Sequence, residues 1–366
     1  MRLGVRGALV AGDLVAGDVE VADGRIAGVG VQPAGATGLA VPGFVDLQVN
    51  GFGGVDFLAA DGAGYVRAGT ALAATGVTAY QPAFISSPLD AYWPALGEAG
   101  AAQLADGGPR VLGVHMEGPF LSPDFAGAHD PADLLDPDPA LADKLREAGP
   151  AGYWTVAPEL RGGLELVSHL VGTGAVVALG HTGADAAVAR AAFDRGAAAV
   201  THLYNAHRRW QPRDPGVAGV ALTRADVVVQ AIIDGIHLAP ETAHQTFLAA
   251  RGRFALVTDA MEAAGLPDGS YRLGGHAVEV HGGAVRLADG TLAGSVLTMD
   301  QAVRNLVALG IDVGDAVAAA SAVPARLLGR ADLGDLRPGM AADIAVLDEE
   351  LRVTRTLVRA AEVWHA

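Results

Sequence analysis

The sequence predicts an α/β protein built around a (β/α)8 barrel, the TIM barrel. Apolar, strand-like runs alternate with loops and Ala-rich helical segments through the middle of the 366-residue chain. Polar residues that suit catalysis follow several of these runs at intervals of about 20 to 35 residues, the length of one strand-and-helix unit. Regular spacing of functional residues at strand ends is what such a barrel produces.

The two ends of the chain lack this alternation of strand and helix. The first ~40 residues form short alternating pieces with a tight turn at Asp23-Gly24, and the last ~30 predict two strands around an acidic turn at 348–350. We expect both ends to pair into one small sheet domain beside the barrel. The predicted division assigns residues 1–41 and 335–366 to the small domain and residues 42–334 to the barrel.

One strand-and-helix unit lies between His181 and His202, which are 21 residues apart. The segment GADAAVARAAFDRG between them predicts a helix that Gly196 ends. A doubly wound open sheet is the alternative, but it would gather its functional residues at one switch point. Here they are spread over several successive units, which favours the barrel. Residues 271–294 predict a β insertion within it.

The bulk composition excludes several classes of partner. The formal net charge of −16 argues against nucleic acid and anionic membranes. The absence of cysteine excludes disulfides and thiolate metal sites, and it fits a reducing cytoplasm, where we expect the protein. The chain has no uninterrupted apolar run long enough to predict a membrane span. Asp13 and Asp18 also break any signal-peptide core near the start.

A basic segment, HRRWQPRDPG at residues 207–216, stands out in this acidic chain. A protein of such negative charge can bind an anionic small molecule only where cations are gathered locally. The three arginines of this segment could provide such a place. The alternative is a solvated basic loop without a ligand.

Four polar residues at the ends of strand-like runs predict a metal hydrolase: Glu117, His181, His202 and Asp259. Catalytic zinc sites use neutral imidazoles and carboxylates and leave one position open. One glutamate and two histidines fill three positions, and Asp259 remains as a proton shuttle. Taken singly, Glu117 could be a solvated loop residue, each histidine a hydrogen-bonded core or loop residue, and Asp259 a helix N-cap.

Three further histidines lie in the same part of the chain. His115 precedes Glu117 by two positions, so on a strand both side chains point the same way, and His115 could contact a ligand rather than be one. His129 lies in a polar loop rich in Asp and Pro, where exposure is expected. His237 follows another long apolar run.

Nine segments, in order along nearly the whole chain, match one known family. They are PGFVDLQVNGFGG (42–54), HMEGPFL (115–121), ALGHTGAD (178–185), THLYNA (201–206), RDPG (213–216), IIDGIH (232–237), LVTDAM (256–261), LAGSVLTMDQAVRN (292–305) and RPGMAADIAVLD (337–348). Together they resemble the N-acetylglucosamine-6-phosphate deacetylase family of the amidohydrolase superfamily. Any one segment would be a weak signal, whereas the set is specific.

The resemblance implies a fold and a set of catalytic residues. The fold is a catalytic barrel of the amidohydrolase type with a small β-sandwich domain formed by both termini, usually as a homodimer. Glu117, His181 and His202 would bind one divalent metal. Asp259 would perform acid–base catalysis, and His129 would help to polarise the acetyl carbonyl.

The resemblance also implies how the substrate is held. Gly118 belongs to the implied substrate-binding set. Asn205 and Ala206 would offer backbone groups to the sugar phosphate, alongside His237. Arg213 would reach the neighbouring site of a homodimer and clamp the phosphate there, because a guanidinium recognises phosphate bidentately.

The chain departs from the family at two places. Many amidohydrolases hold a second metal with a His-x-His pair after the first barrel strand, but here Gln48 and Asn50 occupy that place, near the metal site. Neutral amides are poor zinc ligands, so we predict one metal per chain: zinc, with iron, cobalt or manganese as alternatives. The second departure is His207 to Trp210, where relatives commonly have Met and a Pro-containing segment, and it lies close to the phosphate clamp.

The implied reaction is hydrolysis of the acetamide of N-acetylglucosamine 6-phosphate to glucosamine 6-phosphate and acetate. The alternatives are another metal amidohydrolase, such as an N-acetylgalactosamine-6-phosphate deacetylase or an N-acyl amino acid hydrolase. A non-catalytic relative with a structural or sensing role is the third possibility. It is disfavoured because all the matched ligand and proton-shuttle positions are present.

Overall fold

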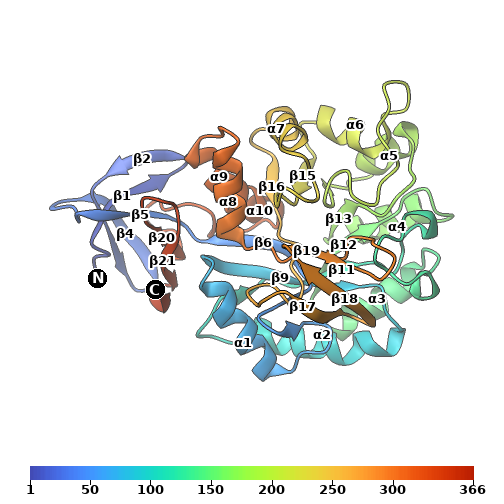
Figure 1. Ribbon diagram of the computed structural model, residues 1–366, viewed down its shortest axis with the longest axis horizontal. Coiled ribbons are helices and arrows are strands. Elements are labelled where there is room, and N and C mark those ends of the chain that lie inside the picture. Colours follow the sequence, from blue (N-terminus) through green and yellow to red (C-terminus); the bar gives the residue numbers. More distant parts are fainter.

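In the computed structural model, which describes residues 1–366, eight strands form a parallel barrel at the centre of the molecule (Figure 1). Each pairs in parallel with its neighbour in the chain, from the first strand to the eighth. The predicted fold class is therefore confirmed. The barrel strands are β6 (Phe44–Val49), β9 (Val77–Ile85), β11 (Val114–Glu117), β12 (Ala151–Val156), β13 (Val176–Leu179), β14 (Ala199–Val200), β15 (Val228–Ala231) and β16 (Phe254–Leu256).

The first and last strands, β6 and β16, close the barrel at one end only. Beyond the end of β16, the backbone N–H of Asp259 donates to the carbonyl oxygen of Gln48 at 2.9 Å. The N–H of Asn50 donates to the carbonyl of Ala260 at 2.8 Å. The seam between β6 and β16 is therefore joined by the segments that carry the predicted site.

The barrel strands are almost continuously apolar because their residues are buried on both faces. All nine residues of β9 and all six of β6 are buried. Most of their apolar residues, among them Leu47 and Phe84, belong to a core cluster of 81 buried residues that fills the barrel and the layer between strands and helices.

Helices cover the outside of the barrel, and aspartate side chains begin several of them. Asp61, Asp138, Asp185 and Asp312 each accept hydrogen bonds from backbone N–H groups of the first helical turn. The helix expected between His181 and His202 is α5. The helices are α1 (Gly62–Ala73), α2 (Leu89–Gln103), α3 (Pro139–Ala148), α4 (Gly163–Gly172), α5 (Ala186–Asp194), α6 (Gly216–Thr223), α7 (Pro240–Ala249), α8 (Met299–Ala308), α9 (Val313–Ala320) and α10 (Ala322–Leu327). None has the length and apolar character that spanning a bilayer requires.

Both ends of the chain meet in a six-stranded sheet beside the barrel, where Figure 1 shows the two termini close together. A β3–β4 hairpin packs on this sheet around 12 buried apolar residues, which gives two β layers. The domain boundaries themselves stay a prediction. The sheet contains β2 (Asp13–Ala16), β1 (Val5–Val10), β5 (Thr37–Pro42), β20 (Ile344–Leu347), β21 (Val353–Val358) and β22 (Ala361–His365), and the hairpin contains β3 (Asp18–Ala22) and β4 (Arg25–Val31).

The remaining strands lie near the closed end of the barrel or at its edge. The expected β insertion is a three-stranded antiparallel sheet of β17 (Gly269–Leu273), β18 (His276–His281) and β19 (Ala284–Arg286). Its apolar side chains pack against Ile85, the last residue of β9, and Met261, which lies beyond the end of β16. The short elements are β7 (Gly51–Phe52), β8 (Val55–Asp56), β10 (Arg110–Val111) and the 3-10 turns Pro123–Phe125 and Pro131–Asp133.

Candidate active site

The predicted residues converge at the carboxyl end of the barrel strands. Glu117 is the last residue of β11, and His181, His202 and Asp259 follow β13, β14 and β16 within three residues. All four line one cavity of about 220 Å³. The φ angles of His181, His202 and Asp259 are 48°, 26° and 50°. Residues other than glycine rarely adopt positive φ angles. Such conformations cluster at functional sites, where the surrounding structure holds the strain.

Glu117, His181 and His202 present their polar atoms to one another at short range. The Nε2 atoms of His181 and His202 lie 3.2 and 2.9 Å from Oε1 of Glu117, and 3.2 Å from each other. Two imidazole nitrogens aimed at one carboxylate oxygen form a compact donor set of the type that divalent cations use. The donor set therefore fits a metal, and burial of all three side chains would shield it from competing water.

The hydrogen bonds of His181 fix which ring nitrogen faces the site. Its Nδ1 lies 3.0 Å from the carbonyl oxygen of Phe125, which can only accept, so Nδ1 carries the proton. The lone pair of Nε2 is then free for a cation. Burial raises the pKa of Glu117, but hydrogen bonds with His181 and His202 outweigh it and hold that pKa well below the usual value. The carboxylate is therefore ionised, the form that binds metal.

His129 is buried, so the expectation that its polar loop leaves it exposed is wrong. Its Nδ1 accepts a hydrogen bond from the backbone N–H of Ser86 at 3.1 Å, and its Nε2 is 3.9 Å from Oε2 of Glu117. Burial lowers the pKa of His129 to about 3, so the ring is neutral and its single proton is on Nε2. Although His129, Glu117 and His181 lie close enough to form a metal group by distance, a protonated Nε2 donates a hydrogen bond and cannot ligate.

Asp259 is held by two amide side chains from β6 and the loop after it. Gln48 Nε2 and Asn50 Nδ2 donate to its Oδ1 at 3.1 and 2.7 Å. Gln48 Nε2 also donates to Oε1 of Glu117 at 2.8 Å, so it bridges the two carboxylates. Burial and the charge of Glu117 raise the pKa of Asp259 to about 6, which suits a group that both takes and returns a proton.

His115 forms no hydrogen bond with the predicted metal ligands. Its ring nitrogens lie 3.1 Å from the carbonyl oxygen of Leu47 and 2.7 Å from Oγ1 of Thr155. Burial lowers its pKa to about 4, so the ring is neutral. His115 is a hydrogen-bonded residue of the barrel interior.

The residues assigned to substrate binding separate into two groups. Asn205, Ala206 and His237 line the cavity, whereas Gly118 and Arg213 do not. Gly118 directly follows Glu117, with φ of 104°, and a Cβ there would lie 2.2 Å from Oγ of Ser86. Arg213 is exposed and has no hydrogen-bond or ion-pair partner within the chain.

Two carboxylates that were not predicted, Asp46 and Asp234, hydrogen-bond to residues of the site without lining the cavity. Asp46, fully buried in β6, accepts hydrogen bonds from Oγ1 and the N–H of Thr258, at 2.6 and 3.3 Å. Asp234 accepts from Nδ1 of His237 at 2.7 Å and from its backbone N–H at 2.8 Å. A carboxylate inside an apolar strand, as in VDLQV, is the signal that could have pointed to Asp46, because burial without a partner is costly.

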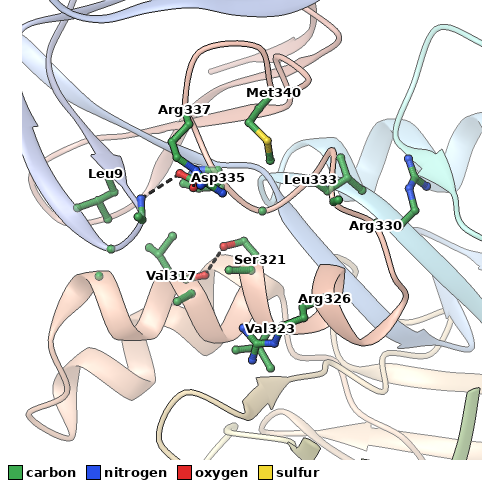
Figure 2. Close-up of a pocket in the computed structure, with 18 of the residues that line it drawn as sticks. Leu9, Val317, Ser321, Val323, Arg326, Arg330, Leu333, Asp335, Arg337 and Met340 are labelled. Carbon is green, nitrogen blue, oxygen red and sulfur yellow. Dashed lines mark hydrogen bonds and ion pairs between the residues drawn. The ribbon is translucent and has the colours of Figure 1, made fainter. Parts of the chain in front are cut away.

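A larger cavity lies elsewhere, between the terminal sheet and helices α9 and α10 (Figure 2). Its volume is about 570 Å³, and its charged residues include Asp335, Arg330 and Arg337. These charges pair internally, since Arg330 bonds Asp332 and Arg337 bonds Asp335. It contains no group of histidines and carboxylates, so the smaller cavity is the candidate active site.

Comparison with known proteins places the chain in a family. Residues 39–363 match the model of the Amidohydrolase family. The chain is 39% identical over 329 residues to N-acetylgalactosamine-6-phosphate deacetylase of Escherichia coli O157:H7, covering 88% of this chain and 86% of that protein. It is 38% identical over 342 residues to N-acetylglucosamine-6-phosphate deacetylase of Bos taurus, covering 89% and 83%.

Solved structures agree with the sequence matches. An N-acetyl-D-glucosamine-6-phosphate deacetylase variant from Mycobacterium smegmatis, in complex with N-acetyl-D-glucosamine-6-phosphate, has a TM-score of 0.93 at 36% identity and 99% coverage of both chains. N-acetylglucosamine-6-phosphate deacetylase of Thermotoga maritima has a TM-score of 0.93 at 30% identity and full coverage. The chain is therefore a hydrolase of the amidohydrolase family, and its resemblance to the N-acetylglucosamine-6-phosphate deacetylases is confirmed.

Proposed function

We propose that the protein hydrolyses the acetamide of N-acetylglucosamine 6-phosphate to glucosamine 6-phosphate and acetate. The observation that carries this proposal is the convergence of Glu117, His181 and His202 beside Asp259 in one buried cavity. The relatives and solved structures named above support the choice of substrate.

We infer that one divalent metal, zinc, binds to Glu117, His181 and His202. When bound, such a cation lowers the pKa of a water molecule and polarises a carbonyl group. The single-metal prediction is supported by Gln48 and Asn50, whose NH2 groups are directed at carboxylates.

The side chains of the cavity can carry out the proton transfers of amide hydrolysis. Oδ1 of Asp259 accepts the two amide donors, so Oδ2 is available to take a proton from the attacking water. Asp259 then gives this proton to the departing amine nitrogen, acting first as base and then as acid. The Nε2–H of His129 donates to the carbonyl oxygen, where negative charge develops during attack.

The sugar phosphate would be held by Asn205, Ala206 and His237, which line the cavity. The phosphate would be clamped by Arg213 from a neighbouring chain of a homodimer. This assignment is supported by the exposure of Arg213 and by its lack of a partner within its own chain. We place the protein in the cytoplasm, in keeping with its lack of cysteine.

The galacto epimer of the substrate is a second candidate, favoured by the 39% identity to the Escherichia coli N-acetylgalactosamine-6-phosphate deacetylase. The test measures acetate release from both 6-phosphates and from N-acetylglucosamine without phosphate. Metal content is determined on the same sample. Activity that depends on the phosphate, with about one metal per chain, is expected. Equal rates with and without the phosphate would contradict the phosphate-binding proposal, and the faster epimer identifies the sugar.

The variant Asp259→Asn tests the proton shuttle. It should keep the metal content of the wild type and lower turnover by about 10²- to 10⁴-fold, because the amide cannot accept the proton. Near-normal turnover in Asp259→Asn would show that another group performs the transfer.

A further inference from the structure

Three buried imidazole nitrogens beside the candidate metal centre have no protein partner. They are Nδ1 of His202 and both Nδ1 and Nε2 of His207. The two rings are 6.1 Å apart, centre to centre, and inclined by 54°. Buried polar nitrogens almost always have a hydrogen-bond partner, from protein or ordered water. Nδ1 of His202 and one ring nitrogen of His207 are therefore close enough to share a partner that lies between the rings.

The orientation of His202 requires an acceptor at this place. Its Nε2 points at Glu117 and His181, so in a metal-bound ring the proton must be on Nδ1. For His181 the carbonyl of Phe125 fulfils this need. For His202 no protein atom forms a hydrogen bond with Nδ1, and the ring of His207 lies 6.1 Å from that of His202, centre to centre.

His207 is held at this position by its backbone. The N–H of Thr182 donates to the carbonyl of Ala206 at 3.2 Å, and the N–H of Arg208 donates to the carbonyl of Thr182 at 2.9 Å. Thr182 directly follows His181, so His207 is tied to the loop that carries another predicted ligand. Burial holds the pKa of His207 well below its ordinary value, so the ring is neutral and one nitrogen can accept.

The ring separation suits a bridging water better than a direct bond. Two hydrogen bonds of ~2.9 Å that meet at a water molecule separate the outer nitrogens by roughly 4.5 Å. The ring centres are then about 6 to 7 Å apart, which matches the 6.1 Å between these rings.

We propose that His207 is a positioning residue that orients the metal ligand His202 through one buried water. The Nδ1–H of His202 donates to the water, and the water donates to a ring nitrogen of His207. This inference rests on the proposed metal site at Glu117, His181 and His202. It gives a role to a residue at which the chain departs from the pattern of its relatives.

The test measures zinc affinity by competition with a chelator, and the zinc release rate, for three variants. His207→Leu removes the acceptor at similar size, His207→Gln keeps an acceptor, and Trp210→Ala is a control in the same loop at an exposed residue. We expect His207→Leu to bind zinc about 10- to 100-fold more weakly. His207→Gln should regain most of this affinity, and Trp210→Ala should match the wild type.

The outcomes separate this inference from the proposed function. Wild-type affinity in a folded His207→Leu variant would overturn the role of His207, whereas absence of zinc binding in the wild type would overturn the metal site itself. If His207→Leu does not fold, the role of His207 is tested by nitrogen-15 NMR spectra of the histidine rings in the zinc-loaded wild type. A slowly exchanging Nδ1–H on His202 supports the proposal, and rapid exchange contradicts it.

Discussion

Asp46 should make the stability of the protein fall as the pH rises. This carboxyl is fully buried, and burial raises its pKa from 3.8 to about 7, although hydrogen bonds from Thr258 lower it. Between these two pH values the folded chain keeps a proton on Asp46 that the unfolded chain has lost. Stability from this group is therefore fully present below about pH 4 and is lost progressively up to about pH 7.

The size of the effect follows from the pKa difference. A difference of about three pKa units corresponds to at most about 4 kcal/mol of unfolding free energy. The variant Asp46→Asn removes the ionisation but keeps an oxygen that accepts from Thr258. The difference in unfolding free energy, variant minus wild type, should therefore rise between about pH 4 and 7 and level off above.

Urea denaturation at several pH values measures this difference. Both proteins are first treated with a chelator, so that no bound cation adds charge near Asp46. The variant Asp185→Asn is a control of opposite sign, because backbone hydrogen bonds at the start of α5 lower the pKa of Asp185, an exposed group. Parallel pH curves for Asp46→Asn and the wild type would refute the argument that Asp46 is protonated in the folded protein.

Three other variants test how the site is held. Asp234→Asn removes the charged acceptor of His237 and should raise KM for the sugar phosphate about 10-fold, with a smaller change in kcat. The reason is that a charge-assisted hydrogen bond contributes about 1.5 kcal/mol or more. An unchanged KM would contradict the proposed role of His237 in substrate binding. Gly118→Ala places a Cβ 2.2 Å from Oγ of Ser86 at a φ of 104°. Thermal unfolding should therefore show that the free energy of unfolding falls by about 2 kcal/mol or more. A variant with the wild-type Tm would contradict this prediction. Arg213→Ala should raise KM for the phosphorylated sugar only, and an equal change for the unphosphorylated sugar would exclude a phosphate contact.

The barrel and the predicted site residues could be recognised because their signals are local. Each of Glu117, His181, His202 and Asp259 lies at or just after the end of an apolar strand, and the carboxyl ends of barrel strands meet at one face. Their positions along the chain therefore imply their proximity in space. The same reasoning predicted that His115 points the same way as Glu117, but the partners of the His115 ring depend on neighbouring strands.

Long-range contacts account for what the sequence analysis did not predict. Asp46 bonds Thr258, 212 residues later, and only closure of the barrel brings the two together. His129 lies in a loop of polar composition that indicated exposure, yet the loop folds inward and its ring accepts from Ser86. The local sequence does not reveal these contacts, because they depend on how the loops fold over the end of the barrel.

The seam between β6 and β16 has a consequence for the order of events during synthesis. Gln48 and Asn50 emerge from the ribosome early, whereas the Asp259 segment that they bond arrives about two hundred residues later. A nascent chain that ends after His202 but before Asp259 has all three predicted metal ligands but an open barrel. The chain should therefore bind the cation tightly only after residue 260 has left the exit tunnel. Bound metal would then distinguish chains with a closed barrel from those with an open one.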